Sequence, residues 1–306
     1  MARLKAIDAL LESFRQQRPL RGGSLIITLF GDSISQHGNS VWLGSIIKSL
    51  EPFGLNSRLI RTAVHRLSQE DWLTSHQVGR RSYYSFTQAG LRRYEKAAQR
   101  IYAGGPPDWD GGWTLVICDK LQDEGRERLR KELSWLGYGE ISNSVLLHAG
   151  GERSGLSETL RDLGLSDNVV VMDAHTAGIN SEVALRQLAQ ESWPLQELAQ
   201  RYRNFLARFS PLLKSVQSVK TLSAEQAFQL RTLLVHEYRR ILLRDSDLPA
   251  KLLPDNWAGH EALLLVDSIY RLVAPRAEMY LAESMETAEG VLPGASPSYG
   301  SRFGGL

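Results

Sequence analysis

The sequence predicts an α+β protein in three parts: an N-terminal winged helix-turn-helix over residues 1–105, a small ferredoxin-like βαββαβ domain over 106–180, and an all-helical part over 181–306. Three observations carry this prediction. Residues 43–81 follow the order helix, turn, helix, hairpin. The glycine- and proline-rich segment 103–112 marks a linker. After residue 181, the apolar residues repeat only at helical spacing.

The helix-turn-helix itself is expected within residues 43–68. Apolar residues of the first helix repeat at i, i+3, i+4 and i+7, which makes one buried face. The segment EPFG at 51–54 breaks that helix, and Asn56 can cap a second one that begins at Ser57. The expected buried face of the second helix consists of Leu59, Ile60, Ala63, Val64 and Leu67.

The opposite face of the second helix is polar and basic. It presents Arg58, Arg61, Thr62, His65 and Arg66. Two strand-like runs follow at 72–78 and 83–86, and the turn between them carries Arg80 and Arg81. Guanidinium groups and hydroxyls suit base edges, and cations at a hairpin tip suit phosphates. These seven residues are candidate contacts to double-stranded DNA, although a solvated basic helix face would look the same.

Charge is divided unevenly along the chain. Residues 1–105 carry 15 Lys and Arg against 7 Asp and Glu, a formal charge of +8, whereas the remainder carries 21 basic and 27 acidic residues, a charge of −6. A polyanion would therefore be attracted to the first third and repelled by the rest. The acidic part is better suited to sensing or assembly.

The other elements of the first part are mostly helical. Helices are expected over 3–17 and 25–34, with a short first strand at Val41-Trp42. Thr87 is the expected N-cap of a helix that runs to Tyr102.

The central and C-terminal parts differ in periodicity. Strands are expected at 113–118, 140–141, 144–148 and 169–173, and helices at 124–136 and 157–163. This order predicts the ferredoxin-like topology. Further on, the sequence predicts an apolar helical stripe over 195–209, a helix opened by a capping box from Ser223 to Gln226, a last helix over 260–273, and a disordered tail from about residue 290.

Several classes of protein are excluded by composition. The lone cysteine, Cys118, rules out an intramolecular disulfide and any multi-cysteine zinc site, and its apolar surroundings predict a buried thiol. The chain lacks a run of about 18 apolar residues and a signal-peptide core, so a cytoplasmic protein without a membrane partner is expected.

Specific segments resemble a known family. Residues 24–32 (SLIITLFGD) resemble the opening motif of the PaaX family of bacterial repressors, and 80–87 (RRSYYSFT) resemble its wing. HEYRR, LRD, LP, LLP and WAG, between residues 236 and 259, resemble its C-terminal signature. The match runs in order through all three parts, with Ser246 and Ala258 where the family usually has proline.

This resemblance implies a function. It implies a dimeric repressor with a GntR-like winged helix that binds operators of phenylacetate catabolic genes and is released by phenylacetyl-CoA. It also implies that the central domain is similar to the small fold of CRISPR-associated endonucleases. We therefore expect a homodimer on a palindromic operator, with an aromatic acyl-CoA as effector and no cofactor. The stripe over 195–209 is a candidate dimer interface or core.

Six residues are candidates for contact with the effector. They are His236, Arg239, Arg240, Arg244, Trp257 and Tyr270. Guanidinium forks suit the phosphates of coenzyme A, and Trp257 or Tyr270 would accept a phenyl ring. An internal network that locks the loop 245–259 onto a helix explains the charged residues equally well.

Two other functions remain open. Asp119 ends the first central strand, where the related endonucleases hold a metal, so Asp119 with Asp173 or His175 would serve a metal-dependent nuclease. A turn residue or helix cap at Asp119 is the simpler interpretation. The sequence contains neither a nucleophile elbow nor a phosphate loop, and we assign no catalytic residue and no metal ligand. The other possibility is a DNA-binding dimer that senses nothing.

Overall fold

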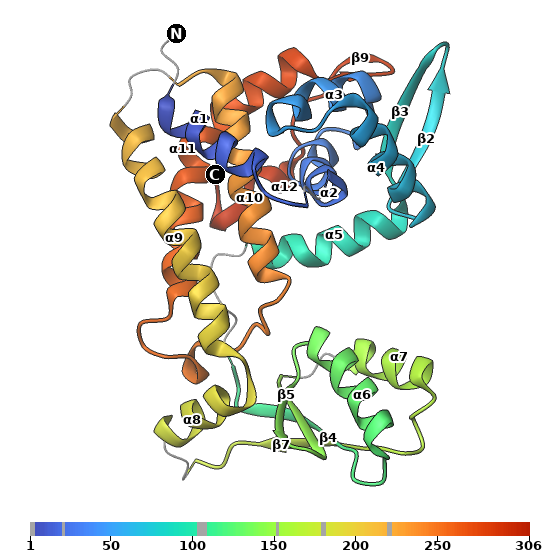
Figure 1. Cartoon of the computed structure of the whole chain (residues 1–306), viewed down its shortest axis with the longest axis vertical. Coiled ribbons are helices and arrows are strands. Elements are labelled where there is room, and N and C mark those ends of the chain that lie inside the picture. Colours follow the sequence, from blue (N-terminus) through green and yellow to red (C-terminus); the bar gives the residue numbers. More distant parts are fainter. Residues whose placement is uncertain (1–3, 20–21, 103–108, 151–152, 179–181, 219–221) are drawn as a thin grey trace. The chain divides into compact units, whose positions relative to one another are not determined.

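The chain forms two compact units. The computed structural model describes residues 4–19, 22–102, 109–150, 153–178, 182–218 and 222–306. The first unit comprises Met1–Gly104, Phe205–Arg240 and Ala262–Leu306, and the second comprises Gly105–Asn204 and Ile241–Glu261. Helices predominate beside small sheets (Figure 1), which confirms the α+β class. The helical segment 181–306 contributes to both units.

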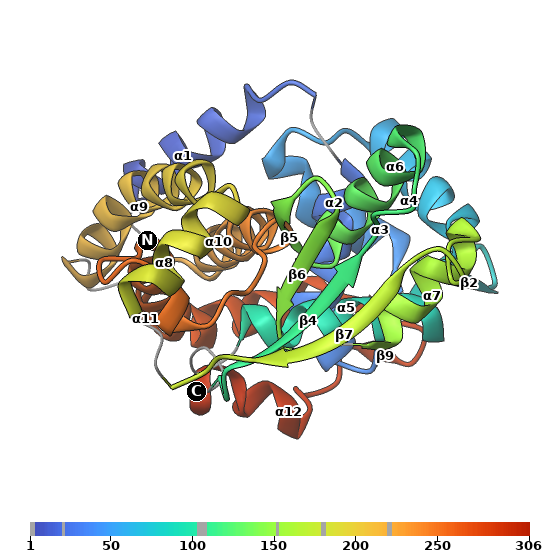
Figure 2. The ribbon, with the colours of Figure 1, turned by 90° about the horizontal axis from the view of Figure 1, so that it is seen from below.

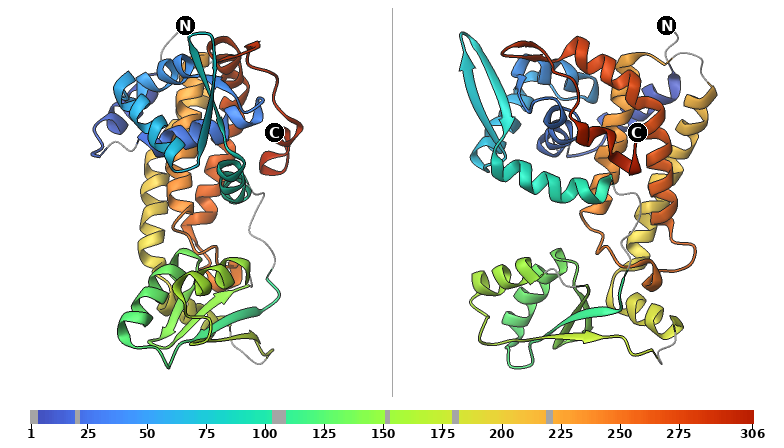
Figure 3. Two further views of the ribbon diagram at one scale, coloured as in Figure 1. Left: turned by 90° about the vertical axis from the view of Figure 1, so that its right-hand side faces the viewer. Right: turned by 180° about the vertical axis from the view of Figure 1, so that it is seen from behind.

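The N-terminal elements of the first unit follow the expected order. They are α1 (Lys5–Arg15), α2 (Gly22–Asp32), β1 (Val41–Trp42), α3 (Leu43–Leu50), α4 (Ser57–Gln69), β2 (Leu73–Val78), β3 (Arg81–Phe86) and α5 (Gln88–Ile101). The three strands form an antiparallel sheet in the order β1-β3-β2. Strands β2 and β3 extend from the helices as a hairpin, coloured cyan in Figure 3.

Helix ends in this part are set by the predicted caps. The Asn56 side chain accepts a hydrogen bond from the Leu59 N–H at 2.9 Å, and the Thr87 hydroxyl accepts one from the Gly90 N–H at 2.8 Å. Each bond satisfies a backbone donor that the first helical turn leaves free.

Helix α2 is the buried core of this part, because every residue from Leu25 to Asp32 is buried. Helix α5 packs closely against it at Gly31. A Cβ atom at Gly31 would lie 1.9 Å from the Tyr94 ring, so only glycine permits this approach.

The C-terminal helices complete the first unit. They are α9 (Leu195–Ser218), α10 (Ala224–Leu242) and α11 (Ala258–Ser284), each of which has one end in the second unit. They are followed by β8 (Glu286–Thr287), β9 (Gly290–Val291) and α12 (Pro297–Gly300). Phe205 of α9 packs against Tyr238 of α10, with ring centroids 5.7 Å apart. Phe228 of α10 stacks on Tyr280 of α11 at 4.5 Å.

Helix α10 begins as predicted, with one difference. The Ser223 hydroxyl accepts a hydrogen bond from the Gln226 N–H at 3.1 Å. The Gln226 side chain does not close the capping box; it bonds both the N–H and the carbonyl of Leu4, at 2.9 and 3.2 Å. Gln226 therefore joins α10 to the start of α1.

The structure decides between two interpretations of one C-terminal segment and corrects two other expectations. Of the two interpretations of the stripe over 195–209, dimer interface or core, the burial supports core, since Leu198 is 6% exposed and Phe209 is fully buried. Helix α11 continues past Val273 and contains Pro275, because buried neighbours on the same helix hold it in place despite the missing N–H. The tail from about residue 290 is not disordered, since Arg302 and Phe303 are buried.

The second unit is built on one four-stranded sheet. Its elements are β4 (Gly112–Ile117), α6 (Asp123–Trp135), β5 (Gly139–Ser142), β6 (Val145–Ala149), α7 (Arg153–Leu163), β7 (Val170–His175) and α8 (Glu182–Ser192). The antiparallel order β5-β6-β4-β7 (Figure 2) is the arrangement of ferredoxin-like domains. Helices α6 and α7 close its core, in which Cys118 is buried as expected.

Within the described ranges, no helix combines the length and the apolar character that crossing a membrane requires.

Candidate functional site

Helix α4 holds the most exposed group of predicted site residues. Ile60, Val64 and Leu67 are buried and fasten the helix to the first unit. All five predicted residues on its outer face, Arg58, Arg61, Thr62, His65 and Arg66, are exposed. Leu59 was expected inside but is 48% exposed, because it lies beside the basic face rather than over the core.

Local contacts already engage part of this basic face. Arg66 forms an ion pair with Glu70 at 2.7 Å, one helical turn further on. The Thr62 hydroxyl donates to the Arg58 carbonyl at 3.0 Å, so its oxygen keeps its acceptor capacity. Arg61 Nε lies 3.4 Å from the Ser57 hydroxyl. The face presents a mixture of cations and hydroxyls at helical spacing.

The two arginines at the hairpin tip, Arg80 and Arg81, have different surroundings. Gly79 has φ of +60°, which forms the tight turn, and Arg80 next to it is exposed. Arg81 donates to the Glu286 carboxylate at 2.6 Å and lies over the Trp42 ring at 4.3 Å. The hydrogen bond to Glu286 is the main cause of a raised pKa for Arg81. Arg80 and Arg81 were predicted as equivalent cations, but only Arg80 extends without this pairing.

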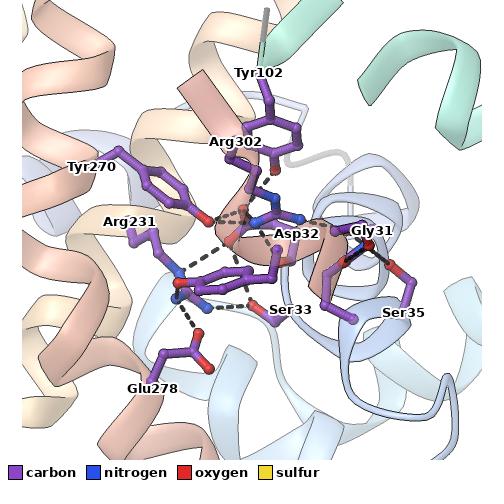
Figure 4. Close-up of polar contacts among 12 residues, drawn as sticks. Gly31, Asp32, Ser33, Ser35, Tyr102, Arg231, Tyr270, Glu278 and Arg302 are labelled. Atoms are coloured by element: carbon purple, nitrogen blue, oxygen red, sulfur yellow. Dashed lines mark hydrogen bonds and ion pairs between the residues drawn. The ribbon is translucent and has the colours of Figure 1, made fainter. Parts of the chain in front are cut away.

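A buried polar cluster, which we call the Asp32 cluster, holds α2 to the rest of the first unit (Figure 4). One carboxylate oxygen of Asp32 accepts hydrogen bonds from the Tyr102 and Tyr270 hydroxyls, at 2.6 and 3.0 Å. The same oxygen lies 3.0 Å from Arg302 Nη1, and the other lies 3.0 Å from Arg231 Nε. Residues from α10, α11, the tail and the position that follows α5 therefore meet at the end of α2.

A second carboxylate balances the charges of this cluster. Glu278 of α11 accepts from Arg231 at 2.6 Å and contacts His37 Nε2 at 2.7 Å. Burial alone would raise the pKa of Glu278, but the hydrogen bonds from His37 and Arg231 lower it to about 2. Each buried guanidinium group of the cluster therefore has a carboxylate partner, which buried charges require.

This cluster was not predicted from the sequence, although two of its residues stand out there. Asp32 ends an otherwise apolar helix, and Arg231 stands among leucines. Charged residues are almost never fully buried unless they are paired. Each of these two residues therefore required a partner, but the sequence could not say which one.

Three predicted effector residues of the first unit are buried. Tyr270 is fully buried within the Asp32 cluster and offers no open slot for a ring. The Thr28 hydroxyl donates to the Ser24 carbonyl, so its contact with His236 Nδ1 at 3.1 Å requires the Nδ1–H of His236 to donate. Burial lowers the pKa of His236 to about 3, so this ring is neutral at pH 7.

The two neighbouring arginines on α10 lie in different environments. Arg239 is buried, and Nη1 contacts the Ser24 hydroxyl at 3.5 Å. Burial lowers the pKa of Arg239. Arg240 is half-exposed and pairs with Glu237 at 3.2 Å. Neither contact involves the loop 245–259, so these two arginines do not form the loop-locking network that was the alternative to effector binding.

The remaining effector candidates, Arg244 and Trp257, belong to the second unit. Arg244 is exposed, whereas Trp257 is 5% exposed and packs edge-on against Tyr202, with centroids 5.9 Å apart. The Tyr202 hydroxyl donates to the Asp245 carboxylate. The loop 245–259 is thus fastened to α9 within this unit.

The central carboxylates do not assemble a metal site in the part of the chain that is described. Asp119 is exposed after β4, and Asp173 and His175 lie on β7. Across the described ranges, no group of three or more His, Cys, Asp or Glu side chains has the arrangement needed to hold a metal.

The chain matches protein-family models along most of its length and one relative over nearly all of it. Three protein-family models match it in succession: "PaaX-like protein" at residues 21–90, "PaaX protein central Cas2-like domain" at 106–185, and "PaaX-like protein C-terminal domain" at 193–283. The transcriptional repressor PaaX of Escherichia coli K12 is 37% identical over 304 residues, which cover 99% of this chain and 96% of that protein.

A solved structure resembles the fold. The uncharacterized protein Rv0674 from Mycobacterium tuberculosis superposes with a TM-score of 0.54 at 18% identity. The match covers 84% of this chain and 97% of that one.

Proposed function

This chain belongs to the PaaX family of transcriptional repressors, and from that premise we propose that it represses phenylacetate catabolic genes as a dimer on a palindromic operator and leaves that operator when phenylacetyl-CoA binds. The family comprises regulators rather than enzymes, which sets aside the nuclease alternative. Because the proposed partner is operator DNA, we also propose that the protein is cytoplasmic.

The exposed basic face of α4 is the observation that carries this proposal. Its guanidinium groups stand outward because the other side of the helix is buried in the first unit. The order of α3, α4, β2 and β3 is that of a winged helix-turn-helix, in which the second helix enters the major groove. We therefore propose that Arg58, Arg61, Thr62 and His65 face the major groove with Arg66 beside them, while Arg80 and Arg81 contact the backbone or the minor groove.

Dimerisation supports specificity in this proposal. One recognition helix reads only a few base pairs, and a two-fold dimer doubles the site that is read. Because the apolar residues of the stripe over 195–209 are buried in the core, we propose that the dimer contact uses other surfaces of the chain. Sedimentation at micromolar concentration, with and without DNA, tests the dimer, and a monomer in both conditions would contradict it.

The third part of the proposed function is the release of the repressor from DNA when the effector binds. A ligand releases a repressor only if it binds the DNA-incompetent state better, and DNA must then weaken ligand binding by the same factor. Among the charged candidates for effector contact, Arg240 and Arg244 are the two whose side chains are exposed to solvent.

The test is a titration of the purified protein on promoter fragments of phenylacetate catabolic genes. Phenylacetyl-CoA, phenylacetate and plain coenzyme A are added separately to the complex. We expect only phenylacetyl-CoA to release the DNA, and we expect Arg244→Ala to keep operator binding but blunt release. If DNA binds but all three ligands leave the complex intact, the protein is a repressor without this effector.

A further inference from the structure

The second unit contains a cavity that none of the contacts above explains. It has a volume of about 240 Å³ and lies between the first turns of α9 and the loop 254–258. Its wall includes Gln196, Ala199 and Arg203 on the α9 side and Pro254, Asn256 and Trp257 on the loop side. All of these residues belong to one unit, so the cavity is complete within it.

The aromatic wall of this cavity is held in place before any ligand binds. Trp257 packs on Tyr202, whose hydroxyl bonds Asp245, and Asp245 in turn accepts the N–H of Asp247 at 2.9 Å. A Cβ atom at Gly259 would lie 2.4 Å from the indole nitrogen, so only glycine leaves room for this ring position. A preformed aromatic surface costs little ordering on binding.

One guanidinium group at the cavity, that of Arg203, remains available to pair with an anionic ligand. Arg203 is exposed, and its guanidinium group donates to the uncharged Gln200 amide oxygen at 3.2 and 3.3 Å. The arginines near it are neutralised: Arg201 by Glu197 at 2.6 Å and Arg186 by Asp255 at 2.9 Å. No carboxylate of a described residue forms an ion pair with Arg203 among those the structure records.

We propose that this cavity binds the aromatic acyl end of an anionic thioester. The aryl ring lies against Trp257, the acyl oxygen accepts a hydrogen bond from the amide of Gln196 or Asn256, and the anionic remainder extends outward past Arg203. This site rests on the proposed function, which supplies the ligand, while the cavity supplies its place and orientation.

The volume of the cavity fits a ligand whose aryl end lies inside it and whose nucleotide lies outside. A protein cavity of about 150 Å³ holds a benzene molecule, so about 240 Å³ accommodates an aryl ring and a few more atoms. Pockets for whole drug-sized ligands begin at about 300 Å³. The nucleotide of coenzyme A therefore remains outside, where a guanidinium group suits its phosphates. A free arylacetate is the other anion with a matching ring, and the experiment separates the two.

The experiment is calorimetric titration of the full chain with phenylacetyl-CoA, acetyl-CoA, coenzyme A and phenylacetate. Ala199→Phe fills the cavity with a new ring. Ala207→Phe, at an exposed position of the same helix, is the matched control. Arg203→Gln keeps the length of the side chain and removes its charge.

We expect Ala199→Phe to weaken phenylacetyl-CoA binding about tenfold or more, because burying a phenyl group contributes at least that factor. Ala207→Phe should bind as the wild type does. Arg203→Gln should weaken binding of the thioester severalfold, whereas we expect phenylacetate to bind weakly to the wild type and equally weakly to this variant. Circular dichroism establishes that each variant is folded, and Arg203→Gln keeps the test decisive if Ala199→Phe fails to fold.

The two ways to fail are distinct. Wild-type affinity in both Ala199→Phe and Arg203→Gln would overturn the site and leave the effector intact. Tight phenylacetate binding that Arg203→Gln abolishes would overturn the thioester in favour of the free acid. Absence of phenylacetyl-CoA binding to the wild type would overturn the site together with the effector part of the proposed function.

Discussion

The Asp32 carboxylate lies 3.0 Å from the Arg302 guanidinium group, so the scaffold helix α2 is bonded to the last turn of the chain. Both residues are buried, with exposed fractions of 1% and 5%. Arg302 also donates to the carbonyl of Asp32 at 3.0 Å. The position of α2, and with it the packing beneath α4, therefore depends on the C-terminal tail.

The first prediction concerns this pair. Asp32→Asn would leave Arg302 and Arg231 buried without their shared carboxylate, and loss of one member of a buried ion pair costs about 3–5 kcal/mol. Urea denaturation measures this loss. Glu197→Gln removes one partner of a solvent-exposed ion pair and should have little effect on stability, because water and salt screen such pairs. Similar small losses for both variants would show that the cluster does not stabilise the fold.

The second prediction concerns pH and His236. Its pKa falls from 6.5 when unfolded to about 3 in the buried site, so the unfolded chain binds the extra proton between these values. The free energy of unfolding is therefore not reduced by this residue above about pH 6.5. As the pH falls from 6.5 toward 3, it decreases by about 1.4 kcal/mol per pH unit.

Denaturation at several pH values checks the second prediction. His236→Gln cannot titrate but keeps an amide donor for Thr28, so its stability should depend less on pH between 6.5 and 5. An unchanged pH dependence in this variant would contradict a neutral, buried His236.

The third prediction concerns the exposed face of α4. If Arg61 contacts a base, Arg61→Ala should weaken operator binding by about 1–3 kcal/mol and relax the preference at one position. Competition binding with single-base operator variants measures both effects. Lys214→Ala removes a cation from α9 and should leave binding unchanged. Unchanged operator binding by a folded Arg58→Ala/Arg61→Ala double variant would rule out this face.

The fourth prediction separates the two wing arginines. Arg80→Ala should weaken binding to all sequences alike and lower the slope of log K against log salt by about 1. Arg81→Ala should have a smaller effect, because Glu286 already neutralises part of its charge at 2.6 Å. Glu286→Gln should strengthen binding and steepen the salt dependence. Equal slopes for the two alanine variants would refute the pairing as a functional difference.

Local sequence determined the secondary structure well. Asn56, Thr87 and Ser223 are capping residues at the predicted positions, because a cap and its partner lie within three residues of each other. Helical spacing similarly identified the buried and exposed sides of α4, with Leu59 as the exception at the border between them.

Candidate site residues were less predictable where their environment comes from distant segments. Tyr270 was expected to face a ligand, but its hydroxyl bonds Asp32, 238 residues away. Arg81 was expected to offer its charge to DNA phosphates, and in the structure it pairs with Glu286, 205 residues away. Spacing along the chain carries no information about such partners.

By itself, the sequence determined the order of elements, the basic face of α4 and the family signature, because each depends on residue types within a few positions. Only the tertiary structure decided which charged residues are buried together, that the tail closes over Asp32, and that Trp257 forms the wall of a cavity. These features arise when helices that are far apart in the chain pack together. A buried ion must then be paired, and its partner comes from a distant segment that no local pattern specifies.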